Sequence, residues 1–94
     1  MIVWTDQALR QLDQAHDYIA ITNSHDVALN VTIRIITQVQ QLNTFPMSGR
    51  TGRVAGTREL IIGGTPFIAV YSIAEERIVI LAVYHSARQW PEGF

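Results

Sequence analysis

Residues 57–85, TRELIIGGTPFIAVYSIAEERIVILAVYH, decide the fold, because their apolar side chains alternate or run together as they do in β-strands. We expect three strands, over residues 57–62, 66–73 and 77–84. Gly63 and Gly64 suit the positive φ angles of a tight hairpin turn, and residues 74–76 form the next turn. The last strand is apolar almost throughout, which is typical of a central strand with neighbours on both sides. The sequence therefore predicts a three-stranded meander.

Two helical patterns come before the meander. Thr5 and Asp6 offer an N-cap hydroxyl and a first-turn carboxylate, so we expect the first helix to begin near Asp6 and to end by Thr22. Ser24 offers a second cap, and Pro46 ends the second helix because it disfavours helical backbone at the residue before it. Apolar residues recur at helical spacing in both segments: Ala8, Leu12, Ala15 and Ile19, then Ala28, Val31, Ile35, Val39 and Leu42.

The remaining segments complete an α+β domain. Residues 1–4 form a short β-prone run, whereas residues 47–56 have little periodicity and indicate a loop or an irregular edge strand. Helices grouped before strands imply that a two-helix hairpin packs on one face of an antiparallel sheet of about four strands. We expect four aromatic side chains to fill the core between the two layers: Tyr18, Phe45, Phe67 and Tyr71.

Size and composition limit the class of protein. The chain has 94 residues, which suits a single domain over residues 1–94. Apolar residues make up 48% of it and charged residues 16%, which argues against disorder and leaves apolar surface for a partner to cover. A net charge of −1, with no Lys, excludes a basic nucleic-acid-coating protein. Because Cys, a signal-peptide pattern and a membrane-length apolar run are all absent, we expect a soluble cytoplasmic protein with no membrane contact.

Arginine, rather than a known catalytic motif, marks the possible site. The sequence has no Gly-rich phosphate loop, no nucleophile elbow and no His pair at metal-ligand spacing, so we expect no metal and no cofactor. Guanidinium groups pair with phosphate or carboxylate in bidentate fashion. The second half of the chain contains four arginines that could form such a site: Arg50, Arg53, Arg58 and Arg88. They form either a cluster that binds an RNA backbone or an acidic protein surface, or a set of solvated residues at strand edges.

His85 follows the last strand, and we expect it at the mouth of the sheet beside Arg58. An imidazole exchanges protons near neutral pH and a guanidinium stabilises a developing phosphorane, so this pair suits RNA cleavage. The catalytic set is incomplete, because no Asp, Glu, Lys or His lies between Asn43 and Arg58, and Glu59 points to the face opposite Arg58. The alternative is a structural role in which His85 hydrogen-bonds the C-terminal tail, which Trp90 anchors.

Four segments resemble one group of bacterial proteins. They are WTDQALRQLDQAHDYI at 4–19, PMSGRTGRVAGTREL at 46–60, TPFIAVYSI at 65–73 and IVILAVYHSARQWP at 78–91. Their order and spacing over essentially the whole chain resemble the toxins of the RelE/ParE superfamily, from type II toxin-antitoxin modules. The resemblance implies a helical hairpin on a sheet, and a cognate antitoxin that is encoded beside the toxin and forms a hetero-oligomer with it.

The resemblance implies different activities for the two branches of the superfamily. RelE-like members are ribosome-dependent mRNA endoribonucleases, and by motif position Arg58 and His85 match an Arg and a His that such nucleases use. ParE-like members poison DNA gyrase by trapping its cleaved-DNA complex. GTREL, TPFIAVY and HSARQWP are closer to the ParE-like branch, and the net charge of −1 fits an RNA-built ribosomal site poorly.

We therefore predict a ParE-like gyrase toxin that is itself no enzyme. The alternative is a RelE-like nuclease that acts on the ribosome and its mRNA, with Arg58 and His85 as catalytic residues; a third is a degenerate toxin that only binds its antitoxin. The residues expected to bind a partner are Arg50, Arg53, Arg58, Arg77, His85, Arg88 and Trp90. An apolar helical hairpin on a small sheet also leaves a groove or an open strand edge for the antitoxin.

Overall fold

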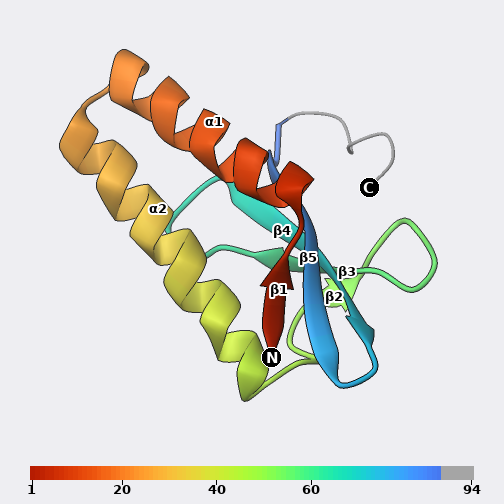
Figure 1. The fold of residues 1–94 in the computed structure, drawn as a ribbon. Coiled ribbons are helices and arrows are strands. Elements are labelled where there is room, and N and C mark those ends of the chain that lie inside the picture. Colours follow the sequence, from red (N-terminus) through yellow and green to blue (C-terminus); the bar gives the residue numbers. More distant parts are fainter. Residues whose placement is uncertain (88–94) are drawn as a thin grey trace.

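In the computed structural model, which describes residues 1–87, two helices cover one side of a five-stranded sheet (Figure 1). The elements in chain order are β1 (Ile2–Trp4), α1 (Asp6–Thr22), α2 (His25–Gln40), the short 3₁₀ helix η1 (Gln41–Asn43), β2 (Arg50–Thr51), β3 (Arg58–Ile61), β4 (Phe67–Ala74) and β5 (Arg77–His85). The α+β class, the helical hairpin and the three-stranded meander are all confirmed. The ends of α1 and of the three meander strands lie within one residue of those predicted, whereas α2 ends at Gln40, well before the stop expected at Pro46, and η1 continues the chain to Asn43.

The sheet differs from the prediction in its strand number and in one pairing. Its order is β1-β5-β4-β3-β2, so it has five strands rather than about four. The added strand, β2, is two residues long and pairs with β3 at one edge, which confirms the edge-strand alternative for residues 47–56. β1 pairs in parallel with β5, whereas the other pairs are antiparallel. A three-residue strand carries no pattern that indicates its direction, and the long helical segment after it permits a parallel return.

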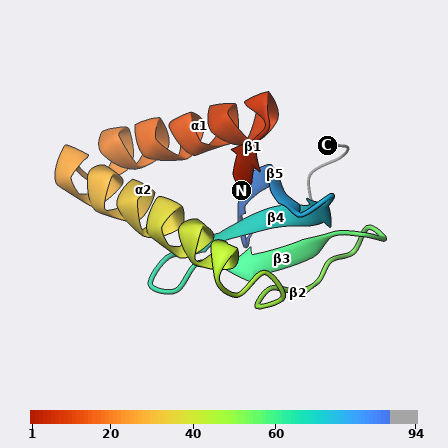
Figure 2. The same ribbon diagram turned by 60° about the horizontal axis from the view of Figure 1, so that its bottom comes forward.

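The helices begin where the sequence supplies caps. The Thr5 hydroxyl accepts a hydrogen bond from the Ala8 backbone N–H at 3.1 Å, and the Ser24 hydroxyl accepts one from Val27 at 3.1 Å. Each bond satisfies a backbone donor that has no partner inside its helix. The joined ends of α1 and α2 project beyond the sheet (Figure 2). Both helices therefore carry apolar residues that the sheet does not cover.

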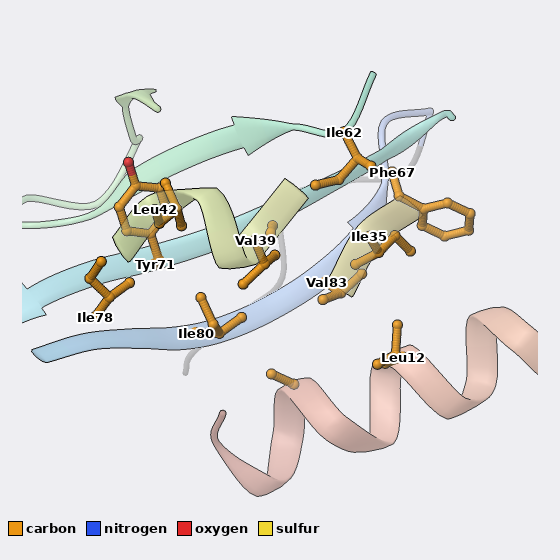
Figure 3. Packing of buried hydrophobic residues seen from close by; sticks show 12 residues of the cluster. Leu12, Ile35, Val39, Leu42, Ile62, Phe67, Tyr71, Ile78, Ile80 and Val83 are labelled. Carbon is orange, nitrogen blue, oxygen red and sulfur yellow. The ribbon is translucent and has the colours of Figure 1, made fainter. Parts of the chain in front are cut away.

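The core lies between the helices and one face of the sheet (Figure 3). Its fully buried side chains include Ile35 and Val39 from α2 and Tyr71 and Ile80 from the sheet. A β-bulge interrupts the register of β4 and β5, because Val70 pairs with Ala82 but Tyr71 pairs with Ile80. Leu81 is thus the extra residue of β5, and beyond it the side chains that face the helices shift by one position.

Tyr71 fixes the loop that follows the helices. Its hydroxyl accepts a hydrogen bond from the Gly49 backbone N–H at 2.9 Å and donates one to the Pro46 carbonyl at 2.8 Å. A Cβ at Gly49 would lie 2.6 Å from the Tyr71 hydroxyl oxygen, so this close approach requires glycine. The prediction that Tyr71 and Phe67 fill the core is confirmed.

The same prediction is wrong for Tyr18 and Phe45, which are 57% and 65% exposed. Tyr18 lies near the projecting end of the hairpin and off the stripe that faces the sheet, and Phe45 follows η1 in the loop. Within residues 1–87, neither helix is long and apolar enough to cross a lipid bilayer.

Candidate functional site

Two adjacent rows of paired residues cross the sheet and place their side chains on opposite faces. One row is Thr51, Arg58, Tyr71 and Ile80, which faces the helices at its Tyr71 and Ile80 end. The other row is Arg50, Glu59, Val70 and Ala82. Paired residues share a face and neighbours along a strand alternate, so the second row lies on the face without helices. We call the two sides the helix-covered face and the helix-free face.

A closed ion pair lies on the helix-free face. The Arg50 Nε donates a hydrogen bond to Glu59 Oε1 at 2.9 Å, and the Arg50 Nη2 lies 2.7 Å from the same oxygen. The Glu59 side chain is only 4% exposed, whereas that of Arg50 is 58% exposed. Glu59 therefore holds Arg50 at the edge of the sheet, and its carboxylate is already paired with that guanidinium. The prediction that Glu59 points away from Arg58 is confirmed.

Tyr84 joins this pair from β5. Burial, chiefly, raises the pKa of its phenol, and the nearby Glu59 carboxylate raises that pKa further, while Arg53 and Arg50 act in the opposite direction. These electrostatic couplings identify Glu59, Arg50, Arg53 and Tyr84 as one cluster. Tyr84 was not among the residues predicted from the sequence. Its pairing with Ile68 beyond the bulge places it on the helix-free face, and the bulge is not readable from the apolar pattern.

Arg58 stands apart from that cluster. Its row partner Tyr71 belongs to the core, so the Arg58 side chain lies on the helix-covered face. The Arg58 Nη2 donates a long hydrogen bond of 3.4 Å to the Met47 carbonyl. Its Nε is buried and has no hydrogen-bond partner among the described residues. The structure therefore separates Arg58 from Arg50 and Arg53, with which the sequence analysis grouped it.

The expectation that His85 lies beside Arg58 is wrong. Arg58 pairs with Tyr71, whereas His85 pairs with Phe67, four residues away along β4. That separation is about 13 Å along the strand direction, and β4 itself lies between the two residues. The two hairpins could have predicted this, because Arg58 lies at the end of β3 remote from the Gly63–Gly64 turn and His85 lies at the end of β5 near it.

His85 has structural contacts instead. Its ring meets the ring of Phe67 edge to face, with 5.5 Å between centroids and an interplanar angle of 79°. Its Nδ1 accepts a hydrogen bond from the Ala87 backbone N–H at 3.1 Å. This is the geometry of the structural alternative, in which the imidazole fixes the chain as it leaves the sheet.

The other predicted partner-binding residues lie elsewhere. Arg77 begins β5 beside the tight turn at Glu75 and Glu76, and its Nη2 lies 3.6 Å from a Glu75 carboxylate oxygen. Arg88 and Trp90 fall outside the described residues. Within residues 1–87 no group of three or more His, Asp or Glu side chains is arranged to hold a metal ion. The structure thus distributes the predicted set over both faces and both ends of the sheet.

Exposed apolar side chains gather on the helical hairpin. Leu29, Ile33 and Ile36 recur at spacings of four and three along α2, so they share one side of that helix. They are 53%, 51% and 37% exposed, and Leu9 on α1 is 45% exposed. α1 and α2 diverge from their joined ends toward the sheet in both views (Figures 1 and 2). This apolar side of the hairpin has the character of a surface that a partner covers.

The chain is similar to known toxins over nearly its full length. The family model for the ParE toxin of the type II toxin-antitoxin system parDE matches residues 2–90. A putative toxin, Y4kP, from Sinorhizobium fredii is 43% identical over 91 residues, which cover 97% of this chain and 93% of that protein. Toxin RelE2 of Caulobacter vibrioides is 32% identical over 87 residues, or 93% of this chain and 96% of the relative.

A solved structure agrees with these relatives. A chain described as the chromosomal ParDE TA system from P. aeruginosa superposes with a TM-score of 0.82 at 28% identity, over 89% of this chain and 92% of that one. The agreement includes the hairpin and the sheet that carry the features described above. The chain is therefore a toxin of the RelE/ParE superfamily and belongs to the ParE toxin family of type II toxin-antitoxin systems.

Proposed function

We propose that this toxin inhibits DNA gyrase by stabilising the complex in which gyrase has cleaved its DNA. The observation that carries the proposal is the separation of Arg58 and His85 by about 13 Å along β4. General acid-base cleavage of RNA needs a proton donor and a proton acceptor within hydrogen-bond reach of one phosphate. A toxin without such a pair acts by binding, which shifts the equilibrium of its target enzyme toward one state.

The helix-free cluster also suits binding better than catalysis. Glu59 is 4% exposed and holds Arg50, so its carboxylate is poorly placed to take a proton from a substrate. The raised pKa of Tyr84 disfavours the phenolate that would act as a base. What the cluster offers to a partner is the guanidinium of Arg50, which is 58% exposed and fixed in direction.

The recognition residues that we propose for the target are those predicted from the sequence, except Arg58. Arg50 belongs to the helix-free face, Arg53 lies in the loop between β2 and β3, and Arg77 and His85 lie at opposite ends of β5. Arg88 and Trp90 follow in the C-terminal segment. A net charge of −1 supports a specific contact with a protein–DNA complex over binding to the RNA of the ribosome. Such a target places the action of the toxin in the cytoplasm.

The antitoxin has a different proposed surface. A type II toxin has an antitoxin partner, and the solved ParDE system supports such a complex for the family. The exposed apolar side of α2, formed by Leu29, Ile33 and Ile36, fits the apolar face of an amphipathic helix. We infer that the antitoxin neutralises the toxin by covering this surface.

The experiment is a gyrase assay with the purified chain. We expect the wild-type toxin to inhibit supercoiling of relaxed plasmid and to raise the amount of linear DNA that detergent and protease release from gyrase. Addition of the antitoxin should reverse both effects. Absence of both effects, with a folded toxin and active gyrase, would overturn the proposal.

The RelE-like nuclease is the second candidate, and one observation favours it. Tyr84 lies with Arg50 on the helix-free face, and the charge of Arg53 also acts on its phenol. A tyrosine beside guanidinium groups is able to contact an RNA phosphate. The test is mRNA cleavage on programmed ribosomes with the wild type, Tyr84→Phe and His85→Gln. If the nuclease reading is right, the wild type cuts mRNA and at least one variant loses about 100-fold or more in rate. Inactivity in both assays would identify the degenerate toxin.

A further inference from the structure

The helical layer ends before the sheet does, and this leaves part of the helix-covered face open. η1 ends at Asn43, and the loop that follows is held over Tyr71 by the hydrogen bonds of the tyrosine hydroxyl. Beyond Tyr71, Ile73 continues β4 and is 42% exposed. A depression of about 410 Å³ lies here, lined by Met47, Thr51, Gly56, Thr57, Arg58 and Ile73. It is separate from the apolar side of the helical hairpin.

Arg58 contributes an unsatisfied charged group to this depression. Its Nε is fully buried and has no acceptor among the described residues, and the hydrogen bond from its Nη2 to the Met47 carbonyl is long at 3.4 Å. A buried donor without an acceptor is costly, more so when it belongs to a charged group. Other strand arginines have carboxylate partners, since Arg50 is paired with Glu59 at 2.7 Å and Arg77 with Glu75 at 3.6 Å.

The guanidinium group of Arg58 determines which kind of acceptor would fit it. The Nε and one Nη of a guanidinium form a planar fork that matches the two oxygens of a carboxylate. Among the described residues no acidic side chain lines the depression, so its charge is complementary to an incoming acid. Met47, which is 64% exposed, and Ile73 add apolar surface beside the guanidinium.

A nucleic-acid backbone fits this depression less well. Phosphate backbones are bound by several cationic side chains along their length, whereas Arg58 is the cation among the residues that line the depression. A peptide with an acidic residue next to an apolar one satisfies both parts of the surface. The geometry therefore favours protein over DNA or RNA.

We propose that the Arg58 depression binds an Asp or Glu side chain of the antitoxin, with a neighbouring apolar residue packed on Met47 and Ile73. This proposal rests on the antitoxin partnership set out above and is independent of whether gyrase or the ribosome is the target. It gives the antitoxin a second, polar contact, at the Arg58 guanidinium that also donates to the Met47 carbonyl. Arg58 then contributes to neutralisation of the toxin rather than to an attack on a phosphate.

The first measurement is the affinity of the toxin for the protein encoded by the adjacent antitoxin gene. We expect Arg58→Gln to weaken binding by about tenfold or more, because an acidic side chain of the antitoxin loses its charged partner. Arg58→Lys should recover part of the loss, since it keeps the charge without the planar fork. The matched control is Arg34→Gln, because the Arg34 guanidinium lies next to Gly64 in the turn between β3 and β4, remote from Arg58. This change should alter affinity by about twofold or less.

A double-mutant cycle then identifies the partner residue. Each Asp and Glu of the antitoxin is replaced by Asn or Gln, and one of these changes should lose its effect when Arg58 is already Gln. Unchanged affinity of Arg58→Gln, or the absence of coupling to every acidic position, would overturn the proposal. Weaker binding to a 20-base-pair DNA duplex, with antitoxin affinity intact, would replace it with a nucleic-acid site.

A measurement on the wild type covers the case in which the variant does not fold. The Arg58 Nε–H resonance in a nitrogen-15 correlation spectrum should shift, and its exchange with water should slow, when the antitoxin is added. An unchanged resonance would contradict the proposal. The same resonance in Glu92→Gln tests the competing acid within this chain, because a shift in the free toxin would show that Glu92 already fills the site. Failure of the gyrase assay leaves all of these outcomes unaffected.

Discussion

The two faces of the sheet use the same strands for different purposes. On the helix-covered face, Tyr71 and Ile80 are fully buried in the core beneath the helices, and Tyr71 holds the 44–49 loop. On the helix-free face, the adjacent row places Arg50 and Glu59 in an ion pair whose guanidinium is 58% exposed. Residues next to each other in the sequence thus serve stability on one face and recognition on the other. The following changes test that division, in order of decreasing effect.

Replacement of Tyr71 should have the largest effect on stability. We expect Tyr71→Ala to lower the free energy of unfolding by about 3–5 kcal/mol, because it leaves a cavity in the core and releases the loop. Tyr71→Phe should cost about 1–2 kcal/mol, since it leaves the Gly49 N–H without an acceptor. Urea unfolding followed by circular dichroism measures both. A loss below about 1 kcal/mol for Tyr71→Ala would contradict the claim that the helix-covered face provides the stability of the fold.

Glu59→Gln tests the helix-free face and should cost about 1–2 kcal/mol. The carboxylate is buried, but the exposed Arg50 regains solvent when the charge of its partner is removed, so the loss is smaller than in the core. The control is Glu75→Gln, whose side chain is 85% exposed and lies 3.6 Å from Arg77. That change should be within about 0.5 kcal/mol of the wild type. Equal losses of unfolding free energy for Glu59→Gln and Tyr71→Ala would mean that both faces stabilise the fold to the same extent.

The smallest expected effect is a dependence on alkaline pH. Burial, then Glu59, raises the pKa of Tyr84 above its usual 10.0, so the folded state keeps the phenol proton longer than the unfolded chain does. This contribution is complete below about pH 10 and is lost as the pH rises from there through the folded-state pKa. The free energy of unfolding should therefore fall more steeply above pH 10 for the wild type than for Tyr84→Phe. If the free energy of unfolding depends on pH in the same way in the two proteins, Tyr84 does not belong to the cluster.

The sequence predicted the helix-covered face well because periodicity controls burial there. The stripes through Leu12 on α1 and Ile35 on α2, the caps at Thr5 and Ser24, and the place of Tyr71 all follow from spacing and local chemistry. These features depend on neighbours within a few residues, so a single sequence carries them.

The candidate site was harder to predict because it depends on register across strands. The bulge at Leu81 shifts the faces of β5 and brings Tyr84 to Glu59, and no local pattern marks it. The distance between Arg58 and His85 depends on two hairpin registers at once. The fold could be predicted from the spacing of apolar residues. The choice between gyrase and ribosome depends on which side chains meet on the surface, and that spacing does not indicate it.

The central claim is that the toxin acts by binding gyrase and not by cutting RNA. The most direct measurement is one time course after induction of the wild-type chain in cells, in which covalent gyrase–DNA complexes and a reporter mRNA are quantified in the same samples. The account predicts that trapped gyrase complexes accumulate before growth stops, while the mRNA remains full-length. Cleaved mRNA at the onset of growth arrest, with no rise in trapped gyrase, would contradict it.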